Sequence, residues 1–201
     1  EVFNTTNAGL SVFSSNYIII GNYIHDNRGD GITALGTGNL ISANIVVNCS
    51  EYGIYIPQGS KNTTVEYNTL LNNMLSGVYL RGADWSSVRH NDFFYSCQEG
   101  QAIDTGENNT FSENYWSDLV GPDDDSNGFV DVPYIVNGSA NNRDYYPRTN
   151  PYNVIPNWIT SETTKKSTTT SNMVIGEYLL VSGIIISSTA VLIILIVRRK
   201  S

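Results

Sequence analysis

Cysteine, histidine and methionine are all scarce in this sequence, with two residues of each among 201. Cys49 and Cys97 are too few to staple a fold with disulfides, and their spacing is not that of a zinc site. A copper site needs His, Cys or Met ligands, and His25 and His90 are isolated residues that we expect on turns or on the surface. The sequence therefore predicts neither a disulfide scaffold nor a soft-metal centre.

Basic residues are also few over most of the chain. Residues 1–157 contain six Lys or Arg against seventeen Asp or Glu, a net charge of −11 with histidine neutral. An acidic body of this kind repels nucleic-acid phosphates, so we expect no nucleic-acid partner. Residue 1 is Glu, and no signal peptide precedes the first structured segment, so we expect the C-terminal part of a longer protein.

The C-terminal segment contains one long apolar run. Residues 178–197 carry no charged side chain, a length that matches the hydrocarbon core of a bilayer. We expect a transmembrane helix over 174–197 and a cytoplasmic basic tail over 198–201, which places the N-terminal body outside the cell. A Thr/Ser-rich stretch, 158–173, fits a stalk between the body and the membrane.

Five Asn-x-Ser/Thr sequons lie on the side that this topology places outside. They fit a glycosylated exterior. The acceptor residues are Asn4, Asn48, Asn62, Asn108 and Asn137.

A repeat of about 23 residues runs through the first 118 positions. It is marked by one asparagine per unit, at intervals of 22, 24, 23 and 23 residues: Asn22, Asn44, Asn68, Asn91 and Asn114. The positions three before and two after each asparagine are apolar in every unit. Each unit contains three short apolar runs, too short and too β-branched for helices.

Three strands in a unit of this length form one coil of a parallel β-helix. Stacked coils lie about 4.8 Å apart and bury a continuous apolar column. We expect the repeated asparagines to be structural, because Asn tolerates left-handed backbone geometry and its amide can bond to the equivalent Asn of the next coil.

These repeats, and the segment NYWSDLVGPDDDSNGFVDVPYIVNGSANNRDYYPRTNP at 114–151, resemble the NosD-like right-handed parallel β-helix proteins. The resemblance implies a right-handed β-helix of a type found on the surfaces of archaea and some bacteria, within a group that includes carbohydrate-binding and sugar-hydrolysing domains. It also offers, as a minor alternative, a periplasmic accessory role in copper-site assembly. The scattered His, Cys and Met residues argue against that role.

The segment GPDDDSNGFVDVPY at 121–134 has the ligand spacing of an EF-hand-like calcium loop. Its candidate ligands, at positions 1, 3, 5, 7 and 9, are Asp123, Asp125, Asn127, Phe129 through its backbone carbonyl, and Asp131. Position 12 of such a loop is normally a bidentate Glu, but here it is Tyr134. We expect a weak, structural calcium ion that pins the cap, with the shell completed by Asp118, Asp124 or Asp144.

Glycoside hydrolysis needs two carboxyl groups about 5 to 9 Å apart, and no pair on the coils forms a pectinase or lyase motif. The candidate acids are Asp26, Asp30, Glu51, Glu66, Asp84, Asp92, Glu99 and Asp104. Glu66 and Arg89 occupy equivalent positions on successive coils and fit a surface ion pair. We therefore expect no catalytic residues in this chain.

Aromatic residues follow the coils and fit either sugar stacking or packing. They are Tyr17, Tyr23, Tyr52, Tyr55, Tyr67, Tyr79, Trp85, Tyr95, Tyr115 and Trp116. The sequence thus predicts an all-β, right-handed parallel β-helix of about five coils over 1–118, a cap over 119–157, and a membrane anchor. We expect a non-catalytic surface module with polysaccharides or cell-surface glycans as partners; the alternative is the C-terminal end of a polysaccharide-degrading β-helix enzyme.

Overall fold

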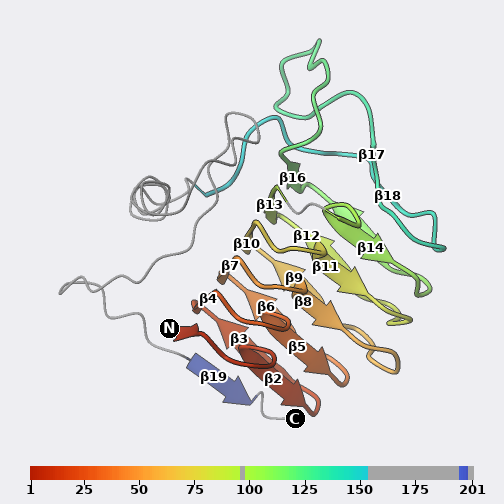
Figure 1. Ribbon diagram of the computed structural model, residues 1–201. Coiled ribbons are helices and arrows are strands. Elements are labelled where there is room, and N and C mark those ends of the chain that lie inside the picture. Colours follow the sequence, from red (N-terminus) through yellow and green to blue (C-terminus); the bar gives the residue numbers. More distant parts are fainter. Residues whose placement is uncertain (96–97, 154–194, 199–201) are drawn as a thin grey trace, which may run out of the picture.

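Three parallel sheets wind together into a solenoid in the computed structural model, which describes residues 1–95, 98–153 and 195–198. Each coil contributes one strand to each sheet, and the coils stack from the N-terminal end toward the cap (Figure 1). The prediction of an all-β parallel solenoid of about five turns is confirmed.

The strands are short, and within the coils every third strand belongs to the same sheet. Sheet A contains β1 (Val2–Phe3), β4 (Tyr23–His25), β7 (Ile45–Val47), β10 (Thr69–Leu71), β13 (Asp92–Phe94) and β16 (Tyr115–Trp116). Sheet B contains β2 (Leu10–Phe13), β5 (Ile32–Leu35), β8 (Tyr52–Ile56), β11 (Ser76–Leu80) and β14 (Ala102–Asp104). Sheet C contains β3 (Tyr17–Ile20), β6 (Leu40–Ser42), β9 (Thr64–Glu66), β12 (Ser87–Arg89), β15 (Thr110–Ser112), β17 (Tyr134–Ile135), β18 (Arg143–Asp144) and β19 (Leu195–Arg198).

Equivalent apolar residues stack on one another because the parallel strands pair in the same register. In sheet C, the aligned column is Ile19, Ile41, Val65, Val88 and Phe111. In sheet A, it is Ile24, Val46, Leu70, Phe93 and Trp116. All ten side chains are buried. The interior is therefore a continuous apolar column of the kind that the repeat predicts.

The five repeated asparagines are fully or almost fully buried and are joined by hydrogen bonds from coil to coil. The Oδ1 of Asn68, for example, accepts both the backbone N–H and the Nδ2–H of Asn44, at 2.9 Å each. The Nδ2 of Asn68 then donates to Oδ1 of Asn91 at 2.9 Å and to the backbone oxygen of Ile41 at 3.0 Å. We call this row the Asn ladder; its members are Asn22, Asn44, Asn68, Asn91 and Asn114.

The backbone explanation for these asparagines was wrong, because none of them has a positive φ. The left-handed residue is instead the one immediately before each asparagine: Gly21, Ala43, Tyr67, His90 and Glu113, with φ between 53° and 67°. The sharp bend at this corner turns the next side chain inward. Asparagine is therefore selected for its buried amide, while the bend falls on a neighbour that includes bulky residues.

The cap ends the ladder with a carboxylate. Asp144, in β18, is fully buried, and its Oδ2 accepts hydrogen bonds from the backbone N and Nδ2 of Asn114 and from Nε1 of Trp116, at 2.9 to 3.1 Å. Its Oδ1 accepts the backbone N–H groups of Glu113 and Tyr146. The ladder therefore stops at a side chain that only accepts hydrogen bonds.

Aromatic rings close the apolar column at the same end. Trp116 stacks on Phe93 below it, with ring centroids 4.2 Å apart, and on Tyr134 above it, at 3.9 Å and nearly parallel. Tyr134 belongs to β17, which pairs antiparallel with β18. The cap therefore covers the last coil with a ring stack as well as with hydrogen bonds.

β19 pairs antiparallel with β3 at the N-terminal end of sheet C (Figure 1). Its four residues are strand where the sequence predicted the end of a helix and the first residue of a basic tail. Residues 158–173 of the predicted stalk and 174–194 of the predicted transmembrane helix lie outside the described residues. No helix within the described part of the chain has the length and apolar character to cross a membrane.

Candidate functional site

Three tyrosines gather on the outer face of sheet B. Tyr52 and Tyr55 lie on β8 and Tyr79 lies on β11, and all three are half-buried. Tyr55 and Tyr79 each lie between two buried residues, as strand alternation requires for outward side chains. Tyr55 and Tyr79 are register partners on adjacent coils. Ring centroids are 4.9 to 5.8 Å apart, so the three rings form one surface, which we call the tyrosine cluster.

Polar groups surround the tyrosine cluster. The hydroxyl of Tyr52 donates to Glu99 Oε2 at 3.3 Å, and Arg81 Nη1 donates to the hydroxyl of Tyr55 at 3.1 Å. Glu99 and Arg81 are both exposed. The cluster therefore combines apolar ring faces with a carboxylate and a guanidinium at its edge.

The electrostatics around Tyr52 keep its hydroxyl protonated. Burial and the nearby Glu99 carboxylate raise the pKa of Tyr52 to about 12. Burial also raises the pKa of Asp30, which accepts hydrogen bonds from Thr33 Oγ1 at 2.7 Å and from the backbone N–H of Tyr52, and Glu51 adds to that rise. Tyr52 thus stays a hydrogen-bond donor at neutral pH.

The structure sorts the eight candidate acids into different environments. Glu99 and Asp30 interact with Tyr52, and Glu51 interacts with Asp30. These three acids come from three different coils, so their spacing in the sequence does not predict that they lie together. Asp92 and Asp104 are fully buried and bonded to backbone or amide groups. The remaining three serve as local partners: Asp26 bonds His25, Glu66 bonds Arg89 at 2.8 Å, and Asp84 accepts the backbone N–H of Glu107.

The ten aromatic residues of the sequence do not form one row. Trp116 lies in the core column, and Tyr23 is buried beside sheet A. Tyr67 packs on the corner side chain His90, at 4.8 Å between ring centroids, while Trp85 is 59% exposed on a different corner. The tyrosine cluster is therefore a distinct subset, set apart by its strand register.

A family model described as "Right handed beta helix region" matches residues 1–116. The chain belongs to this right-handed β-helix family. The match covers all five Asn-ladder positions and ends at Trp116, so the cap lies beyond it. Neither the curated proteins nor the solved structures include a match to this chain.

His25 is not the isolated turn or surface residue that the sequence predicted, whereas His90 does lie at a left-handed corner. His25 is buried, sandwiched between the rings of Phe3 and Tyr23, and bonded to Glu1 and Asp26 at 2.9 Å each. Burial lowers the pKa of His25, but the hydrogen bonds and charges of Asp26 and Glu1 outweigh it and raise the pKa above its ordinary value. This residue is therefore part of the packing.

Cys49 is buried in the core, where desolvation raises the pKa of its thiol to about 12. The thiol is therefore protonated and poorly nucleophilic at neutral pH. Cys97 lies outside the described residues. In residues 1–95 and 98–153, no three His, Cys, Asp or Glu side chains converge into a group that could hold a metal ion.

The acidic loop of the cap folds around its own backbone. Asp123 accepts the backbone N–H groups of Asn127 and Gly128 at 2.9 and 3.0 Å, and Asp125 Oδ1 accepts that of Asn127 at 3.1 Å. Oδ1 of Asn127 accepts the backbone N–H of Phe129. These oxygens accept hydrogen bonds from within the loop and each keeps a second lone pair, so the order of positions 1, 3 and 5 is that of a calcium loop.

The rest of the proposed calcium shell is less complete. Asp131 accepts the backbone N–H of Asp124 at 2.8 Å, whereas the hydroxyl of Tyr134 is turned to Asp118 at 3.2 Å. Asp144 ends the Asn ladder and is not available as a twelfth ligand. Asp118 also accepts a hydrogen bond from Gln101, so the exposed Asp124 is the acid best able to complete the shell.

The five sequon asparagines differ in accessibility. Asn4, Asn62 and Asn108 are exposed at left-handed turns. Asn48 is half-buried and donates to Asp26 Oδ1 at 3.2 Å, and Asn137 donates to the backbone oxygen of Glu99 at 2.7 Å. The first three are the better-presented acceptor amides.

Proposed function

We propose that this β-helix is a non-catalytic, extracellular surface module that binds polysaccharides or cell-surface glycans through the tyrosine cluster. The observation that carries the proposal is the set of three outward rings within 5.8 Å of one another, edged by Glu99 and Arg81. Aromatic rings supply contact area for the C–H faces of sugars, and the charged groups at the edge can bond to sugar hydroxyls.

The experiment is a glycan array probed with the purified full chain in detergent, followed by affinity measurements on the best glycan. Replacing Tyr79 by Ala should weaken binding about tenfold, because an aromatic contact contributes up to about 1.5 kcal/mol beyond its buried area. Tyr145→Ala is the matched control, since Tyr145 is 66% exposed in the cap. If no plant, bacterial or archaeal polysaccharide on the array binds the chain, the proposal is wrong.

Cleavage of the bound glycan is a second candidate function, favoured by the three carboxyl groups around Tyr52. Asp30, with its raised pKa, is the only one of them that is buried. The test incubates the bound polysaccharide with the full chain and follows the release of reducing ends. A rate that Asp30→Asn abolishes, with binding retained, would favour cleavage over binding alone.

Membrane anchoring belongs to the same proposal. It is supported by the apolar, uncharged stretch 178–197 followed by Arg198, Arg199 and Lys200, and it requires β19 to leave the edge of β3 when the segment enters the membrane. Expression in cells followed by alkaline extraction should leave the chain in the membrane pellet. Truncation after residue 173 should release it to the soluble fraction.

We also propose that the acidic loop binds calcium as a structural ion. The support is the set of hydrogen bonds from the loop backbone to the oxygens of Asp123, Asp125 and Asn127, together with the left-handed Gly128, with φ at 89°. Affinity in the weak extracellular range, about 10⁻⁴ to 10⁻³ M, is expected because position 12 supplies no ligand.

A further inference from the structure

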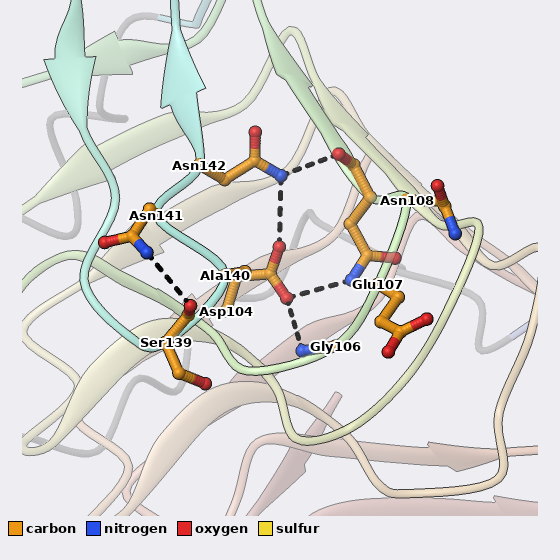
Figure 2. Close-up of a pocket in the computed structure, with 9 residues that line it drawn as sticks. Asp104, Gly106, Glu107, Asn108, Ser139, Ala140, Asn141 and Asn142 are labelled. Carbon is orange, nitrogen blue, oxygen red and sulfur yellow. Dashed lines mark hydrogen bonds between the residues drawn. The ribbon is translucent and has the colours of Figure 1, made fainter.

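A polar pocket lies where the last coil meets the cap. One wall is the turn that follows β14, residues 104–109, and the other is the cap loop before β18, residues 139–142 (Figure 2). Its volume is about 530 Å³, within the range of about 300 to 1,000 Å³ that small-molecule sites occupy. We call it the cap pocket.

Asp104 fixes the floor of the cap pocket. Its side chain is fully buried; Oδ1 accepts the backbone N–H of Gly106 at 2.9 Å and Nδ2 of Asn109 at 2.8 Å, and Oδ2 accepts Nδ2 of Asn142 at 3.1 Å (Figure 2). Asn142 also donates to the backbone oxygen of Asn109 at 2.6 Å. Both walls are therefore tied to one carboxylate, which pre-organises the pocket and lowers the ordering cost of binding.

The backbone holds the cap loop against the same residue. The N–H of Ala140 donates to the backbone oxygen of Asp104 at 3.2 Å. Gly138 has a φ of 108°, and a side chain there would collide with the Asp104 backbone. The loop can therefore approach this closely only with glycine at that position.

The groups that a ligand can reach are almost all neutral and polar. Glu107, Asn108, Ser139 and Asn141 are exposed on the walls. Amides and hydroxyls both donate and accept hydrogen bonds, as sugar hydroxyls do. The exposed amide of Asn141 donates to the backbone oxygen of Ser139 at 3.2 Å, and it can exchange that hydrogen bond for one to a ligand.

The charge of the lining excludes other ligand classes. No Lys, Arg or His lines the pocket, so a phosphate or carboxylate ligand would find no counter-charge. Glu107 is the one accessible carboxylate, because Asp104 is buried and occupied by three neutral donors. A single exposed carboxylate does not make a cation site, and Ala140 is the only apolar side chain for a hydrophobic ligand.

We propose that the cap pocket binds a neutral mono- or disaccharide. Glu107, Ser139 and Asn141 contact its hydroxyls, and Asp104 acts as a positioning residue beneath them. This site shares no residue with the tyrosine cluster, so the proposal for the cap pocket can be correct or wrong independently of the function proposed above.

The test is saturation-transfer NMR and calorimetry on the full chain with glucose, galactose, mannose and N-acetylglucosamine, with glucuronate as the anionic comparison. At least one neutral sugar should bind with a Kd on the order of 1 mM, and glucuronate should bind at least tenfold more weakly. Asn141→Ala and Glu107→Gln should each weaken the neutral sugar about tenfold. Asn150→Ala, an exposed cap residue outside the pocket, should leave it unchanged. All of these variants are compared in the Tyr79→Ala background, so that sugar bound at the tyrosine cluster does not contribute.

Three outcomes would overturn the proposal. The first is no transfer from any neutral sugar, and the second is binding that survives the Glu107→Gln and Asn141→Ala double variant with its fold intact by circular dichroism. The third is a signal lost with Tyr79→Ala, which would assign the sugar to the tyrosine cluster. Calcium chloride is run as a separate arm, and heat that appears with calcium alone and vanishes in Glu107→Gln would make the pocket a cation site instead.

Discussion

The coils and the cap both bury polar side chains, but the two regions use groups with different hydrogen-bonding capacity. In the coils, each ladder asparagine after Asn22 accepts from the preceding member and donates to the next residue of the row, so the pattern can continue. In the cap, Asp144 accepts five hydrogen bonds and donates none. An amide propagates the solenoid, whereas a carboxylate terminates it.

Removing the Asp144 carboxylate, which ends the Asn ladder, should have the largest effect on stability. Asp144→Ala leaves the donors of Glu113, Asn114 and Trp116 unpaired in a buried site, and we expect a loss of about 3 to 5 kcal/mol in the free energy of unfolding. Urea denaturation of the full chain measures it. Asp124→Ala, at an exposed carboxylate, is the control; equal midpoints for both variants would contradict the terminating role.

A carboxylate placed within the Asn ladder should interrupt the ladder there, as Asp144 ends it in the cap. Asn68→Asp keeps the acceptor for Asn44 but faces the Oδ1 of Asn91 and the backbone oxygen of Ile41 with no donor. We expect a loss of about 2 to 4 kcal/mol near neutral pH. Because protonation restores one donor, the variant should recover part of that loss as the pH falls; denaturation at pH 4 and pH 7 checks this, and a pH-independent loss would count against it.

Calcium should act on the cap and leave the coils alone. For a dissociation constant of about 1 mM, 10 mM calcium adds about 1.4 kcal/mol to the folded state. The melting temperature of the full chain should therefore rise with calcium concentration. The rise should disappear in the Asp123→Ala, Asp125→Ala double variant and persist in Asp84→Ala, and no shift up to about 10 mM would end the calcium proposal.

The smallest effect is expected at the opposite end of the solenoid, at His25. Its folded pKa is raised by Asp26 and Glu1, so its contribution to stability is complete below the unfolded pKa of about 6.5 and is lost as pH rises through the folded pKa. Melting temperatures from pH 5 to pH 8 should fall more for the natural chain than for His25→Gln. Parallel curves for the two would show that His25 does not titrate with folding.

The repeat could be predicted because it is written at fixed intervals in the sequence. An asparagine with apolar neighbours recurs every 22 to 24 residues. This pattern alone predicted the coils, the buried apolar columns and the positions of the Asn ladder. The backbone role of these residues was wrong because periodicity locates a corner only to within a residue. Whether Asn68 or Tyr67 takes the left-handed bend depends on which side chain must turn inward.

The cap could not be predicted in the same way, because its contacts have no period. Asp144 lies 30 residues after Asn114, not 23, and reaches the ladder only after the chain has passed through the acidic loop. The tyrosine cluster could be predicted only in part. Its members are among the aromatic residues that the sequence singles out, but the strand register is needed to distinguish Tyr55 and Tyr79 from the buried rings. The cap pocket joins walls about 35 residues apart and left no signal in the sequence.

The parallel stack of Trp116 between Phe93 and Tyr134 has a spectroscopic consequence. Coupled transitions of closely stacked rings give strong near-ultraviolet circular dichroism, and this signal requires Tyr134 of the cap to sit on Trp116 of the last coil. Trp85, exposed on a corner, lacks such a stack. The chain therefore carries its own optical reporter of cap docking, which can be followed separately from the far-ultraviolet signal of the coils.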